Sequence, residues 1–129
     1  MFEFCIPHGL KYTRVAEIEG ALHDRITLRS HGELSELIMF THGVNGTPAK
    51  TSPEDWPSAE QTPGETVSVS QWRCSEGDGR DFRLHHNGRH WRLLTFPLGF
   101  AEYKDVPPSA AERFDKVIDS LCCQPLPPN

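Results

Sequence analysis

The chain of 129 residues carries a formal net charge of −5, and 36% of its residues are hydrophobic and 24% charged. This length suits one domain with a single core and excludes a TIM barrel or two catalytic domains. The acidic balance argues against nucleic-acid binding, which generally requires a strongly basic face. With 11 prolines and 10 glycines, residues 1–129 are expected to form a single turn-rich domain that contains at least one long loop.

The N-terminal residues MFEFCIPHGLKY contain no basic segment followed by an apolar one, so they do not resemble a signal peptide. A run of about 18 apolar residues is also missing, and we therefore expect no membrane partner. The cysteines are Cys5, Cys74, Cys122 and Cys123, and they form no Cys-x-x-Cys pair. We expect a cytoplasmic chain with reduced thiols and without cofactors.

The N-terminal part of the chain predicts β-strands, with one stretch that stays open. Residues 2–6 and 24–30 show the alternation of apolar and polar side chains that is typical of strands. In residues 11–22 the apolar positions fit a helical stripe in part and a strand in part. Both alternatives therefore remain for this stretch.

A second ambiguous stretch covers residues 31–40. Ser30 followed by Glu33 resembles a capping box, which favours a helix. The apolar run Leu-Ile-Met-Phe-Thr is equally typical of a buried strand, and we favour a strand over 36–42. His31 precedes a glycine and is expected to lie in a turn.

Residues 45–66 contain four prolines and almost no aliphatic side chains, which predicts a loop of roughly 20 residues. Within it, the order of residues 52–55 is typical of a helix start, and Pro57 would end such a helix after one turn. Trp56 is expected either to anchor the loop on the domain or to contact a partner. We favour the anchor and keep Trp56 among the candidate partner-binding residues.

Strand signals return at residues 67–73 and continue through 81–96, where Asn87-Gly88 separates two alternating runs. Asn-Gly between such runs is a strong signal for a hairpin with a two-residue turn. Because side chains alternate across a sheet, the turn assigns the side chains of both strands to opposite faces. The predicted core face carries Phe82, Leu84, Trp91 and Leu93, and the predicted polar face carries Asp81, Arg83, His85, His90 and Arg92.

On the polar face Arg83 stands opposite Arg92, a destabilising pair unless Asp81 or an acid from elsewhere bridges it. The face is either a basic patch for an acidic segment of a partner or of the chain's own loop, or a solvated surface with ordinary ion pairs. His85 and His90 would need a third ligand such as Asp81 to hold a metal. No ligand spacing matches a known site, so no metal is predicted.

The chain ends with a predicted helix at 109–121 and a Pro-rich tail at 122–129. Ser109 and Glu112 have the spacing of a capping box. Apolar residues recur at helical spacing, which predicts an amphipathic helix on one face of a sheet. The expected fold class is therefore α+β, with an antiparallel sheet of five to seven strands and this helix packed on it.

Several segments resemble the PsbP-like α/β fold, and specifically the Eag-type chaperones that accompany type VI secretion effectors. In the C-terminal half they are Gln71-Trp72-Arg73, Gly79-Arg80-Asp81, Leu93-Leu94-Thr95 and the helix over 112–121. Phe4-Cys5-Ile6-Pro7 and Asp24-Arg25-Ile26-Thr27-Leu28 are similar to the opening strands of that family. The resemblance covers about half of the chain. It implies an antiparallel sheet with helices on one face and a partner on the other.

The chain contains no nucleotide-binding loop or nucleophile motif, and we expect protein binding without catalysis. The first hypothesis is an adaptor or chaperone for a secreted effector protein. The alternative is an immunity protein that neutralises a toxin through charge complementarity. A hypothesis from another class is a small metal-dependent enzyme that uses His85, His90 and Asp81. The candidate partner-binding residues are Arg83, His85, His90, Arg92 and Trp56.

Overall fold

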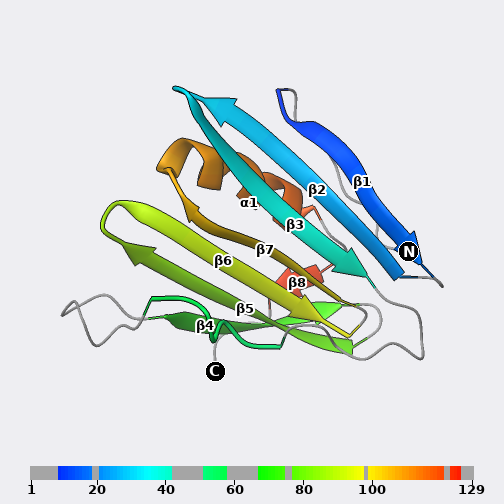
Figure 1. Cartoon of the computed structure of the whole chain (residues 1–129). Coiled ribbons are helices and arrows are strands. Elements are labelled where there is room, and N and C mark those ends of the chain that lie inside the picture. The colour runs from blue at the N-terminus through cyan, green and yellow to red at the C-terminus, as the bar shows by residue number, and fades with distance from the viewer. Residues whose placement is uncertain are drawn as a thin grey trace.

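A computed structural model describes residues 9–18, 21–41, 51–57, 67–74, 77–97, 99–120 and 123–125. The predicted strand at 2–6, and most of the predicted loop and tail, lie outside these residues. The described residues form one antiparallel sheet and one helix (Figure 1). The strands are β1 (Lys11–Ile18), β2 (Ala21–Ser30), β3 (Glu33–Thr41), β4 (Ser68–Cys74), β5 (Gly77–His86), β6 (Arg89–Phe96), β7 (Gly99–Val106) and β8 (Cys123–Pro125), and the helix is α1 (Pro108–Asp119).

The sheet has eight strands in the order β1-β2-β3-β7-β6-β5-β4-β8, and every neighbouring pair is antiparallel. The pairing of β3 with β7 joins two meanders, β1 to β3 and β4 to β7. The predicted α+β class with an antiparallel sheet is confirmed. The strand number exceeds the predicted range because the C-terminal tail contributes the three-residue β8.

The two ambiguous stretches near the N-terminus are both extended. Residues 11–18 form β1, and residues 33–41 form β3. The helix signal at Ser30 and Glu33 is wrong, because the residues between them make a two-residue hairpin turn. His31 and Gly32 have φ values of 53° and 77°, as a type I′ turn requires, and Asn87 and Gly88 repeat this geometry at 51° and 75°.

Helix α1 begins one residue earlier than predicted, and the expected capping box does not form. Its N-cap is Pro107, and no side chain caps the helix. Pro108 occupies the first helical position, where the missing N–H costs nothing and the fixed φ already suits a helix. Ser109 therefore lies inside the first turn and not before it.

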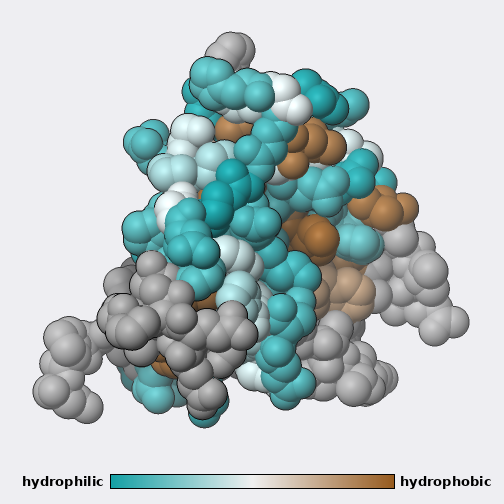
Figure 2. Space-filling view, turned by 60° about the vertical axis from the view of Figure 1, so that its left-hand side comes forward, coloured by the Kyte–Doolittle hydropathy of each residue, from teal (hydrophilic) through white to brown (hydrophobic). Residues whose placement is uncertain are grey.

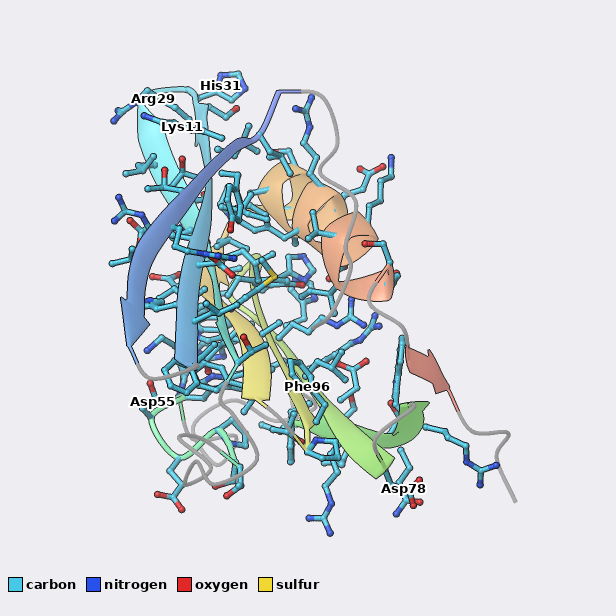
Figure 3. The ribbon with its side chains drawn as sticks, turned by 90° about the vertical axis from the view of Figure 1, so that its right-hand side faces the viewer. Lys11, Arg29, His31, Asp55, Asp78 and Phe96 are labelled. Atoms are coloured by element: carbon cyan, nitrogen blue, oxygen red, sulfur yellow. The ribbon has the colours of Figure 1, made fainter. Side chains whose placement is uncertain are left out.

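Two apolar cores lie on opposite faces of the sheet. The larger one contains residues of β2, β3, β6 and β7 together with Phe114 and Ile118 of α1. The smaller one contains the predicted core face of the hairpin and Trp56. Figure 3 shows this arrangement from the side, with α1 on one side of the sheet and the segment of Asp55 on the other. Among the described residues, no helix combines the length and the apolar character that crossing a membrane requires.

Candidate functional site

The hairpin of β5 and β6 has the predicted register. His85 pairs with His90, and Arg83 pairs with Arg92. The four apolar side chains of the predicted core face are buried: Phe82, Leu84, Trp91 and Leu93. The opposite face, predicted to be exposed, lies on the side of the sheet that α1 covers.

Arg92 is fully buried, so its predicted place on an exposed polar face is wrong. Its Nε and Nη2 donate to the two carboxylate oxygens of Asp81 at 3.0 and 3.2 Å. Its Nη1 donates to Asp115 at 3.0 Å, and Nη2 also donates to Asp119 at 2.9 Å. The reason is the helix: positions 115 and 119 are one turn apart, so both carboxylates reach the same guanidinium.

Asp81 bridges the two opposed arginines, as their like charges require. Its Oδ2 accepts a hydrogen bond from Arg83 Nε at 3.0 Å in addition to those from Arg92. Burial alone lowers the pKa of Arg92, but the hydrogen bonds from this guanidinium to Asp81 and the charges of three aspartates outweigh burial and raise that pKa. Arg92 therefore stays charged, and this buried charge network fastens the hairpin to α1.

Tyr103 extends the buried charge network toward the centre of the sheet. Its hydroxyl donates to Asp115 Oδ1 at 2.9 Å. Burial, followed by the charge of Asp115, raises the pKa of Tyr103 well above its usual value. The phenol therefore keeps its proton and serves as a hydrogen-bond donor and not as a base.

His85 and His90 form a stacked pair at the solvent-facing end of this face. Their ring centroids are 4.5 Å apart and the rings are tilted by only 6°. His85 is exposed and His90 is half-buried, and burial followed by the charge of His85 lowers the pKa of His90. Asp81, the possible third metal ligand beside these histidines, instead accepts hydrogen bonds from Arg83 and Arg92. The part of the chain that the structure describes contains no cluster of three or more side chains suited to a metal ion.

Trp56 anchors its segment, as favoured above, and its buried position argues against a direct role in partner binding. Only 7% of Trp56 is exposed, and its Nε1 donates to Glu102 Oε2 at 2.9 Å. The short helix expected at this point is a single turn closed by the Trp56 N–H and the Pro53 carbonyl at 3.2 Å. Lys104 pairs with Asp55 at 2.7 Å beside it.

Several other arginines are also paired with acids of the chain itself. Arg89 donates to Glu33 and to Asp105 and so links the start of β3 to the end of β7. Arg14 pairs with Asp24 at 2.9 Å, and the exposed Arg25 lies 3.4 Å from Glu36. Consistent with this, the side seen in Figure 2 is mostly hydrophilic, with apolar side chains in small separate areas.

A different surface, missed by the sequence, lies on the sheet face opposite α1. Leu34 of β3 is 47% exposed there, and Ile38 and Phe40 follow along the same strand, both half-buried. Phe40 stacks on Phe100 of β7, with ring centroids 5.9 Å apart. We call this surface the open sheet face: Leu34, Ile38, Phe40 and Phe100, with the neighbouring cations Lys11 and Arg29.

Arg29 stands directly beside the exposed leucine, and Lys11 lies on the next strand outward. Arg29 of β2 is the register partner of Leu34, and Lys11 of β1 is the partner of Thr27, two positions before Arg29. Both are exposed, and Figure 3 shows them at the same end of the sheet. Within the described residues, no acidic side chain pairs with either cation. The sequence did not reveal this cluster because the conformation of 11–22 was open, so the faces of β1 were not assigned.

Comparison of the chain with protein-family models, with curated proteins and with solved structures gives no match.

Proposed function

We propose that the protein is a non-catalytic protein-binding module that holds a partner segment on its open sheet face. The observation that carries the proposal is the exposed Leu34 side chain with Arg29 beside it and Lys11 on the next strand, two cations without an acidic partner among the described residues. A patch of exposed apolar side chains with a polar rim is typical of a binding surface. On the same face, Glu36, paired with Arg25, separates Leu34 from the half-buried Ile38, Phe40 and Phe100, which continue the apolar side chains along the sheet.

Lys11 and Arg29 indicate the chemistry of the partner. The chain as a whole is acidic, with a net charge of −5, so this exposed cationic pair is a local exception. Most of the arginines near the hairpin are already neutralised by acids of the chain itself. The fitting partner is a segment with apolar side chains that enter beside Leu34 and with acidic residues that face the two cations.

Among protein-binding roles, we propose an adaptor or chaperone for a secreted effector protein. The resemblance to Eag-type chaperones implies a partner bound on the sheet face that the helix leaves free. The immunity hypothesis relied on the arginines of the hairpin face for charge complementarity with a toxin. Arg92 is buried among aspartates and Arg83 is paired with Asp81, which leaves less charge there for a partner.

The test is binding of the N-terminal segment of the protein encoded in the adjacent reading frame, measured by calorimetry. Leu34→Glu should weaken binding at least about tenfold, because it places a third charge where apolar contact is needed. Val69→Glu is the matched control: Val69 is 56% exposed on the same sheet face but lies on β4, at the other end of the sheet. The affinity of the Val69→Glu variant for the same segment should stay within about twofold of the wild-type affinity.

Equal effects of the two substitutions, or none, would contradict the proposed surface. The charge of Lys11 and Arg29 is tested by Lys11→Glu and Arg29→Glu, each of which should weaken binding of an acidic segment. Binding instead to a folded toxin domain, abolished by Arg83→Glu and falling steeply with salt, would favour the immunity alternative over the chaperone.

A further inference from the structure

The end of the chain returns to the edge of the sheet and brings two cysteines into register. After α1, β8 pairs antiparallel with the outer side of β4. In this pairing Cys74 stands directly opposite Cys123, followed by Arg73 opposite Gln124 and Trp72 opposite Pro125. The two cysteines are far apart in the sequence, and only the topology brings them together.

This register meets the main geometric requirement of a disulfide. Directly opposed residues of an antiparallel pair have Cα atoms about 4.5–5.5 Å apart. Disulfides usually join residues with Cα atoms about 4.4–6.8 Å apart. We infer that Cys74 and Cys123 are a thiol pair that closes into a cross-strand disulfide when the protein meets a small external disulfide such as oxidised glutathione.

The reaction is two successive thiol–disulfide exchanges. The thiolate of one cysteine attacks oxidised glutathione, forms a mixed disulfide and releases one glutathione thiolate. The thiolate of the other cysteine then attacks the protein sulfur of that mixed disulfide and releases the second glutathione. The two protein thiols lose two electrons and two protons, and these end on two molecules of reduced glutathione.

The bond changes how firmly the C-terminal strand is held. With only three residues, β8 contributes few backbone hydrogen bonds to hold itself on β4. A disulfide at its first residue fixes the chain just after α1 to the sheet and closes a long loop, which restricts the unfolded chain. The oxidised protein is therefore the more stable form, and its β4 edge stays covered from Trp72 to Cys74.

The experiment incubates the full chain with oxidised glutathione, alkylates the remaining thiols and maps peptides under non-reducing conditions. We expect a linked peptide pair containing Cys74 and Cys123, and a melting temperature higher by roughly 5–15 °C that dithiothreitol reverses. Cys123→Ser should abolish both effects. Cys122→Ser, one position earlier, is the matched control and should leave both unchanged.

Three results would overturn the inference. One is that Cys74 and Cys123 are still fully alkylated after oxidation. Another is a linked peptide in which Cys5 or Cys122 replaces Cys123. The third is the same rise in melting temperature on oxidation in the Cys123→Ser variant.

Discussion

Arg92 is the largest fully buried side chain among the described residues, and its guanidinium makes four hydrogen bonds to carboxylates. A buried ion pair of this kind adds little net stability over an apolar replacement of the whole group, because desolvation offsets the attraction. Removing one member alone is different, since it leaves the remaining charge buried without compensation. The network therefore specifies how α1 sits on the hairpin more than it strengthens the fold.

Arg92→Met should lower the free energy of unfolding by about 3–5 kcal/mol, because Asp81 would remain buried with only Arg83 as a partner. Arg83→Met is the control: its side chain is 48% exposed, and its loss should cost about 0–1 kcal/mol. Urea unfolding at pH 7 measures both. A double variant with Asp81→Leu should recover much of the loss. A cost below about 1 kcal/mol for Arg92→Met would show that Arg92 does not neutralise a buried Asp81.

Elements with a strong local signal could be predicted from the sequence, and those fixed by tertiary contacts could not. Asn87-Gly88 carries its own turn geometry, so the register of the hairpin followed directly. His31-Gly32 uses the same geometry, but the capping signal at Ser30 and Glu33 competed with it. The burial of Arg92 depends on Asp115 and Asp119 of α1. The sequence predicted this helix but could not show where it packs on the sheet.

The join between β3 and β7 depends on Gly99. A Cβ atom there would lie 1.8 Å from the Phe40 carbonyl oxygen, so the two strands would have to separate. Gly99→Ala should therefore cost about 3 kcal/mol or more. Gly32→Ala has open space around its Cβ and only the strain of a φ of +77°, so it should cost about 1–2 kcal/mol. Equal losses in chemical unfolding would argue against close contact at this join.

At the scale of the whole molecule, the sheet is covered differently on its two faces. One 12-residue helix covers part of one face and seals the larger core. On the other face, Trp56 covers the hairpin half, while Leu34 and its neighbours stay partly exposed. The sequence predicted one core face and one exposed polar face for the hairpin, whereas both faces are covered in the structure. Local periodicity cannot show that a helix or a loop segment from elsewhere in the chain will cover a strand.

Because Trp56 seals the second core from outside the sheet, removing its ring tests the two-sided architecture directly. Trp56→Ala should lower the free energy of unfolding by about 3–5 kcal/mol, from the lost burial and from the loss of a hydrogen-bond donor to Glu102. Trp56→Phe keeps most of the packing and should cost about 1–3 kcal/mol. Asp55→Ala is the control. Asp55 immediately precedes Trp56 and forms an exposed ion pair with Lys104, so its loss should change the free energy of unfolding by about 0–1 kcal/mol. If Trp56→Ala were as mild as Asp55→Ala, segment 51–57 would not be part of the cooperative fold, and the hairpin half of that face would be open to a partner as well.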